Sequence, residues 1–113
     1  MNSDKYSYKK TERKEELDTI VATLNKNYTR LSQKYKISEI SVIGSYARGE
    51  QTENSDLDIM VDFFEPVGWE VVDLRDELEE LLKLKIDLVL KAGVIQRKRV
   101  YDGILEDIVY VKA

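Results

Sequence analysis

Three aspartates are the residues of this chain best suited to chemistry. Asp56 and Asp58 stand two positions apart in an alternating apolar segment, and Asp87 lies in a later one. Residues two apart on a strand share a face and lie about 6.6 Å apart, at about 3.3 Å of rise per residue. Two ionised carboxylates held so close repel each other unless a divalent cation lies between them. The spacing therefore predicts a metal site, to which Asp87 could add a third carboxylate.

The kind of metal follows from the residue types that the chain lacks. It contains neither histidine nor cysteine, which leaves oxygen ligands and favours magnesium or manganese over zinc. Because magnesium is usually held by one or two carboxylates together with substrate phosphates, a nucleotide is the expected co-ligand. The same absence excludes disulfides, thiolate zinc sites, cysteine nucleophiles and a histidine base.

A phosphate cradle is predicted just upstream of the first two aspartates. Gly44 and Ser45 follow a segment rich in β-branched residues and open a short helical turn, whose free backbone N–H groups can receive a phosphate. Gly44 permits close approach, and Ser45 adds a hydroxyl while serving as the helix N-cap. Without a ligand, Ser45 would be an N-cap alone. Arg48 either contacts the phosphate or pairs with Glu50 or Asp62.

The elements that must position these residues are indicated by the spacing of apolar side chains. Apolar and aromatic residues recur every three or four positions in 11–35 and again in 69–84, which predicts two amphipathic helices. Strands are predicted at 37–43, 56–64 and 85–91, with the aspartates on the side opposite the apolar residues. A short helix at 94–105 and an apolar stretch at 108–111 complete the chain. This order of elements permits an α/β fold.

Length and charge restrict the classes of function. A chain of 113 residues supports one hydrophobic core, so we expect a single domain at 11–113 preceded by a polar tail at 1–10. No stretch is apolar enough to span a bilayer and the start has no signal-peptide pattern, so a cytoplasmic protein with no membrane partner is expected. The net charge of −4 argues against direct nucleic-acid binding as the main task.

Plain structural interpretations remain for these charged residues. Asp56, Asp58 and Asp87 can be solvated strand carboxylates. Asp62 shares the parity of the first two but lies about 13 Å along the strand from Asp56, too far to share an ion, and is expected at the surface. The basic run 97–99 is expected to be a solvated helix face.

The motif as a whole resembles a known family. Gly44-Ser45, then ten residues, then Asp56-Leu57-Asp58 and a later strand with Asp87 resemble the polymerase-β nucleotidyltransferase superfamily. The runs GSYARGE at 44–50 and SDLDI at 55–59 resemble the minimal nucleotidyltransferases, in particular the MntA antitoxins of HEPN/MNT toxin–antitoxin pairs. The segment 104–110 is loosely similar to that group's C-terminal segment. The resemblance implies a small mixed sheet of about four strands with helices packed mainly on one side.

Carried over residue by residue, the resemblance implies a two-metal transferase. Gly44 and Ser45 would bind the triphosphate of ATP. Asp56 and Asp58 would hold two Mg²⁺, and Asp87 would complete the metal site facing the attacking hydroxyl. One ion would lower the pKa of that hydroxyl while the other steadies the triphosphate and the leaving pyrophosphate. The acceptor implied is a tyrosine of a partner HEPN-domain ribonuclease toxin, which AMP transfer would silence.

Two other functions are compatible with the sequence. One is transfer of a nucleotide to a small molecule such as an aminoglycoside, which larger relatives with the same signature carry out. Those relatives have an extra domain that this chain of 113 residues lacks. A contact-only antitoxin would neutralise its partner by binding, with the metal site unused or only structural. Loss of transfer with neutralisation intact, after an alanine change at Asp58, would identify this last function.

Overall fold

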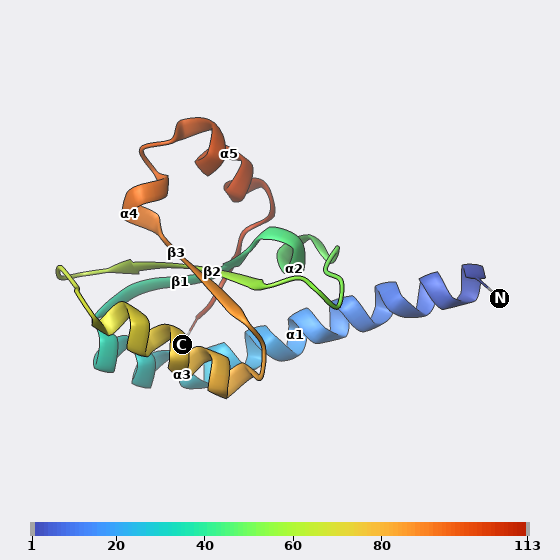
Figure 1. Ribbon diagram of the computed structural model, residues 1–113, viewed down its shortest axis with the longest axis horizontal. Helices are drawn as coiled ribbons and strands as arrows, with labels where there is room; N and C mark the ends of the chain where they lie inside the picture. The colour runs from blue at the N-terminus through green and yellow to red at the C-terminus, as the bar shows by residue number, and fades with distance from the viewer. Residues whose placement is uncertain (1, 113) are drawn as a thin grey trace.

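A four-stranded sheet forms the centre of the molecule (Figure 1). The computed structural model describes residues 2–112, with side chains from Glu12 onward; Met1 and Ala113, at the ends of the predicted tail and domain, lie outside it. The elements in chain order are α1 (Asn2–Tyr35), β1 (Ile37–Ile43), α2 (Gly44–Arg48), β2 (Leu57–Phe63), α3 (Glu70–Leu82), β3 (Ile86–Leu90), α4 (Lys91–Val94), α5 (Lys98–Asp107) and β4 (Val109–Tyr110). None of the described helices is long and apolar enough to cross a membrane.

The sheet is mixed, and its order differs from the order of the chain. The strands lie in the order β3-β2-β1-β4. β2 runs parallel to β3, whereas β1 is antiparallel to both β2 and β4. Strand β2 therefore lies between β1 and β3, and its residues 58–61 have register partners on both sides. The mixed sheet with its helices confirms the predicted fold class.

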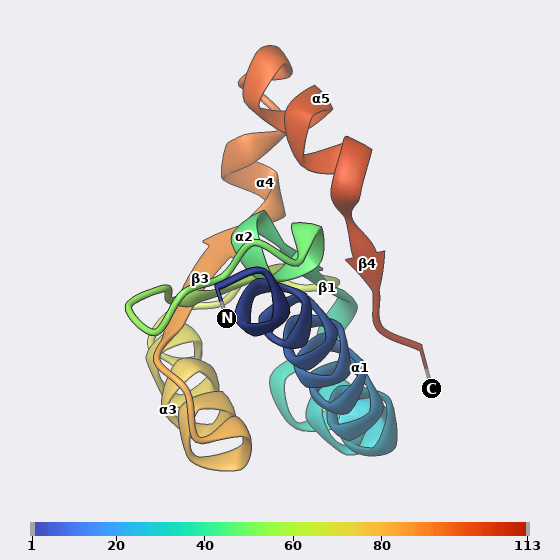
Figure 2. The same ribbon diagram turned by 90° about the vertical axis from the view of Figure 1, so that its right-hand side faces the viewer.

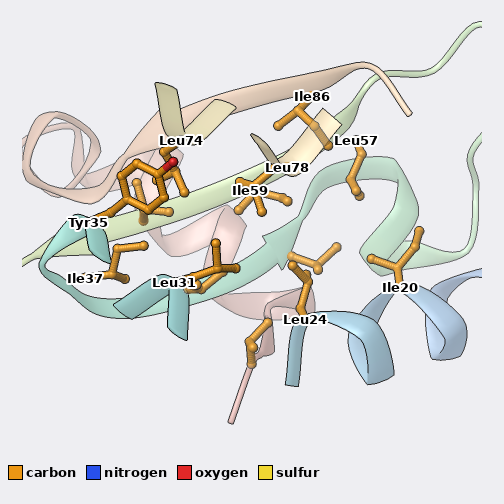
Figure 3. Packing of buried hydrophobic residues seen from close by; sticks show 14 of the residues in the cluster. Ile20, Leu24, Leu31, Tyr35, Ile37, Leu57, Ile59, Leu74, Leu78 and Ile86 are labelled. Carbon is orange, nitrogen blue, oxygen red and sulfur yellow. The ribbon is translucent and has the colours of Figure 1, made fainter. Parts of the chain in front are cut away.

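One face of the sheet carries the hydrophobic core. Helices α1 and α3 lie against this face, and α4 and α5 stand above the opposite one (Figure 2). The alternation predicted for β2 places Leu57, Ile59 and Val61 in the core, each at most 1% exposed. They pack against apolar side chains of the two helices, which include Leu24, Leu31, Leu74 and Leu78 (Figure 3). Residues 56, 58 and 62 thus belong to the other face or its edge.

Several helix boundaries differ from the predicted ones. Helix α1 begins at Asn2 rather than at residue 11, since no glycine or proline precedes Gly44 and nothing in the sequence stops the helix. Helix α3 ends at Leu82 because Lys83 adopts a left-handed conformation, with φ 57°. The helix predicted at 94–105 corresponds to α5, which begins only at Lys98 because Arg97, with φ −107° and ψ 81°, is not helical; the short helix α4 precedes it. The division into a tail at 1–10 and a domain stays a prediction.

Candidate active site

The strand register brings the predicted site residues to one place. Asp58 of β2 is the register partner of Asp87 on one side and of Ile43 on the other. Gly44 follows Ile43 directly, so it lies against Asp58. A Cβ atom on Gly44 would be only 2.3 Å from Asp58 Oδ2, and its φ is +73°. Glycine is therefore required at position 44 for two reasons: the left-handed backbone conformation and the lack of space for a side chain beside the Asp58 carboxylate.

The carboxylates of this site affect one another's protonation. The pKa of Asp58 is raised, first by its burial and then by the negative charges of Asp87 and Asp56 and a hydrogen bond with Asp87; the nearby positive charge of Arg48 opposes the rise. Asp56 lies just before β2, and Asp87 is exposed on β3. The site thus concentrates negative charge at the start of two parallel strands.

This arrangement fits a divalent cation. Two carboxylates in register on neighbouring strands, with a third whose charge acts on Asp58, form an all-oxygen donor set of the kind that Mg²⁺ prefers. Among the described residues, no group of three or more acidic side chains is placed so that it could hold a metal ion without further ligands. That is the usual condition for magnesium, which takes part of its coordination from substrate phosphates and water.

Helix α2 supports the predicted phosphate cradle, with one correction. The helix begins at Gly44, so Ser45 lies within its first turn. The N-cap is Ile43, whose apolar side chain makes no capping hydrogen bond. The prediction that Ser45 is the N-cap was wrong, because Gly44 with its positive φ continues directly into the helix. The first backbone N–H groups of α2 have no side-chain cap and so remain available to an acceptor.

Arg48 closes the same turn. Its Nε donates to Glu50 Oε1 at 3.0 Å, and its charge also acts on Asp58. Of the partners considered from the sequence, the structure therefore shows Glu50. Asp62 is half-buried further along β2, where its charge helps to raise the pKa of Lys91, chiefly set by Glu39. The basic run 97–99 is fully exposed, as expected for a solvated helix face.

A cleft of about 470 Å³ opens in front of Asp58, between α2 and α5. Its floor is made by Gly44, Arg48 and Asp58, and its roof comes from α5. The roof residues are Val100, Gly103, Ile104, Glu106 and Asp107. The cleft thus has catalytic-type polar groups on one side and a partly apolar wall on the other. It can take an elongated ligand that places a phosphate beside Gly44.

The sequence pattern did not reveal the residues of the roof. They lie more than 40 positions after Asp58 and reach the cleft only because β4 returns to pair with β1, which draws α5 over the sheet. A second missed group is Tyr46, Gln51 and Glu16, which join α2 and the following loop to α1. The helical pattern of 94–105 was the one signal that could have pointed to the roof.

Comparison with known proteins agrees with this geometry. The family described as the nucleotidyltransferase domain matches residues 24–111. The protein adenylyltransferase MntA of Thermococcus cleftensis is 39% identical over 96 residues, which cover 84% of this chain and 95% of that protein. A protein of Methanocaldococcus jannaschii, MJ0126, whose assignment as a protein adenylyltransferase is itself provisional, is 41% identical over 84% of this chain and 97% of its own.

Solved structures show the same fold. One described as a minimal nucleotidyltransferase superposes with a TM-score of 0.68 at 31% identity, over 82% of this chain and 93% of that one. A chain of the complex between the tri-AMPylated HEPN toxin of Shewanella oneidensis and its MNT antitoxin shares the fold, with a TM-score of 0.54 at 17% identity over 80% and 71% of the two chains. With the family match covering most of the chain, the protein belongs to the nucleotidyltransferase domain family and resembles its minimal members.

Proposed function

We propose that this protein is an antitoxin-type adenylyltransferase, which transfers AMP from ATP to a tyrosine hydroxyl of a partner HEPN ribonuclease toxin. The observation that carries the proposal is the contact of Gly44 with Asp58, itself in register with Asp87. This contact joins a place for a phosphate to a place for a cation. The curated relatives named protein adenylyltransferases support the reaction, and the tri-AMPylated toxin complex supports the kind of partner.

The three aspartates divide the site between them in this proposal. Asp56 and Asp58 would hold two Mg²⁺, with Asp87 completing the site; when bound, the ions supply Lewis acidity at the acceptor hydroxyl and neutralise charge on the triphosphate. Because burial and its neighbours raise the pKa of Asp58, an added positive charge would stabilise its ionised carboxylate. The carboxylates also receive the proton that the hydroxyl loses.

The nucleotide would be placed by α2. The absent side chain of Gly44 lets a phosphate come close to Asp58, and the uncapped N–H groups of the first turn, with the Ser45 hydroxyl, would donate to phosphate oxygens. Arg48, on the cleft floor, would face the phosphates that leave. The bond between the acceptor oxygen and the α-phosphorus forms while the bond to the β-phosphate breaks, and pyrophosphate departs.

The test is transfer to the partner itself. The purified protein would be incubated with Mg²⁺, labelled ATP and a HEPN-domain protein from the same organism, sought first in the neighbouring genes, and the mass added to this partner would be measured. We expect a gain of one AMP or a multiple, absent with Asp56→Ala/Asp58→Ala and absent with excess EDTA. Omitting the HEPN protein and supplying an aminoglycoside tests the small-molecule alternative.

The outcomes separate the three functions. Tight complex formation without any added mass would contradict the proposal and favour a contact-only antitoxin. Labelling of the aminoglycoside but not of the partner would favour a small-molecule transferase. Replacing the modified tyrosine of the partner by phenylalanine, as a control, should abolish labelling if the hydroxyl is the acceptor.

A further inference from the structure

A carboxylate on α1 receives a hydrogen bond from the loop that carries Asp56. Gln51, in the loop between α2 and β2, is only 4% exposed. Its Nε2 donates to Glu16 Oε1 at 3.2 Å and to the backbone carbonyl of Arg13 at 3.2 Å. Among the described residues between α2 and β2 it alone is buried. The Gln51 side chain therefore attaches the loop to α1, while Glu50 attaches its start to α2.

The same carboxylate also lies beside a tyrosine of α2, since Glu16, Tyr46 and Gln51 line one hollow of the surface. Tyr46 is 4% exposed and sits between Ser45 and Arg48 in chain order. Burial raises the pKa of its hydroxyl, and the nearby negative charge of Glu16 raises the pKa further. Glu16 thus joins two separate parts of the site, the phosphate-cradle helix and the loop that follows it.

The hydrogen bonds of residues 52–55, which follow Gln51, lie within this segment. The backbone N–H of Thr52 donates to Ser55 Oγ at 2.9 Å, and the N–H of Ser55 donates to the carbonyl of Thr52 at 3.1 Å. The residues between them, Glu53 and Asn54, are exposed. Such a local turn fixes its own shape but not its place on the protein. Asp56 follows at once and precedes Leu57, whose backbone N–H donates to the Lys85 carbonyl at 2.9 Å, so Asp56 lies between the point where Gln51 is held and the start of β2.

We propose that Glu16 is a positioning residue for the nucleotide site, acting through Gln51 and Tyr46. By accepting the hydrogen bond from Gln51 and lying beside Tyr46, it orders the loop and α2 against α1, and so helps to hold Asp56 and Ser45 in place relative to Asp58. This inference rests on the proposed function for its catalytic readout. Glu16 lies one turn before Ile20, where the buried stripe of α1 begins, so its role is to order the site rather than to fill the core.

Loss of this contact should weaken nucleotide binding more than it slows transfer. A loop that is not held must be ordered when the nucleotide binds, and that ordering reduces affinity. We expect Glu16→Ala to raise the KM for ATP about 5- to 20-fold with a smaller change in kcat. Because Glu16 is exposed, the Tm should change by only about 2 °C.

The experiment uses an exchange of side chains between the two positions. Gln51→Glu sets a second carboxylate against Glu16, and should raise the KM for ATP at least as much as Glu16→Ala. The double variant Glu16→Gln/Gln51→Glu restores an amide facing a carboxylate, and should recover part of the loss. Glu15→Ala is the matched control, since Glu15 is the adjacent exposed carboxylate of the same charge and helix.

A second readout does not need activity. Amide hydrogen exchange of the protein without nucleotide should be faster across residues 49–56 in Glu16→Ala than in the wild type or in Glu15→Ala. If the wild type transfers no AMP but hydrogen exchange still differs between Glu16→Ala and Glu15→Ala, the proposed function is contradicted while the positioning role of Glu16 is supported. Two results would overturn the inference. One is equal amide hydrogen exchange and equal KM for ATP in Glu16→Ala and Glu15→Ala. The other is a double variant Glu16→Gln/Gln51→Glu whose KM for ATP is no lower than that of Gln51→Glu.

Discussion

At the scale of single residues, two glycines of similar conformation have different tasks. Gly44 and Gly49 both have left-handed backbones, with φ of +73° and +69°. A Cβ on Gly44 would strike Asp58, whereas nothing lies within 4 Å of a Cβ on Gly49. Gly49 ends α2, where its N–H donates to the carbonyls of that helix. The first glycine therefore serves the site and the second serves the helix.

The two alanine substitutions should separate these tasks. Gly44→Ala must displace Asp58, so we expect AMP transfer to fall at least ~100-fold, as a misplaced reacting group does. Gly49→Ala bears only the cost of a left-handed alanine, about 1 kcal/mol of unfolding free energy, and should keep its activity. Steady-state transfer and thermal unfolding of both variants check this. Equal activity of the two would contradict the contact between Gly44 and Asp58.

Asp58 should show a conflict between function and stability. Its raised pKa means that the folded protein disfavours the ionised form, so its charge lowers stability at pH 7. We expect Asp58→Asn to abolish transfer yet leave the metal-free protein as stable as the wild type or more so, by up to ~1 kcal/mol.

Magnesium gives the complementary measurement. Mg²⁺ with a non-hydrolysable ATP analogue should raise the Tm of the wild type by mass action, and should raise that of Asp58→Asn much less. Asp62→Asn is the control, because Asp62 lies on the same strand and outside the cleft. If Asp58→Asn is less stable than the wild type when both are measured without metal, charge repulsion at the site is contradicted.

At the scale of elements, α1 and α3 are joined by one carboxylate as well as by their apolar stripes. Glu77 of α3 pairs with Arg30 and Lys34 of α1 and accepts a hydrogen bond from the Tyr35 hydroxyl at 2.6 Å. These partners, Arg30 first, lower the pKa of Glu77 to about 2. The pair of helices that covers the sheet is thus fixed at the end of α1 nearest to β1.

This cluster should make stability depend on pH in acid. Because the folded pKa of Glu77 lies below the unfolded value of 4.5, its contribution is complete above that value and is lost as pH falls from about 4.5 to 2. Arg30 and Lys34 are half exposed, so solvent screening limits the contribution to ~1 kcal/mol. Glu77→Gln should lose that amount at pH 7 and nothing near pH 2. Urea unfolding at both pH values checks this, and an equal loss at both would contradict it.

At the scale of the whole molecule, the sheet separates what holds the fold from what does chemistry. The core lies between the sheet and the helices α1 and α3, and the cleft lies on the opposite face beneath α5 (Figures 1 and 2). No residue of α5 is buried. A change in the core should therefore alter stability and leave the site unchanged, while α5 can be altered at little cost in stability.

Two leucines test this separation. Leu24 is fully buried, and Leu24→Ala should lower the unfolding free energy by about 2–5 kcal/mol. Transfer per folded molecule, measured well below the Tm, should stay the same. Leu105 of α5 is 40% exposed, and Leu105→Ala should change stability by less than about 0.5 kcal/mol. A large drop in Tm for Leu105→Ala would show that α5 belongs to the core.

The sequence by itself determined which residues could do chemistry and on which kind of element they lie. The alternation through β2 assigned Leu57 and Ile59 to the core and Asp58 to the other face, because side chains alternate strictly along a strand. The spacing from Gly44 to Asp58 placed a tight turn before an acidic strand. Motif and fold class were both available at this level, since they depend on local periodicity and on residue type.

The tertiary structure decided which of these residues meet. That Asp87 adjoins Asp58 depends on the parallel register of β2 and β3, and the contact of Gly44 with Asp58 depends on the antiparallel register of β1 and β2. Pairing between strands is set by packing across the whole core, which no local pattern encodes. For the same reason only the structure revealed α5 above the cleft, and Glu16, one turn outside the apolar stripe of α1, as the partner of Gln51.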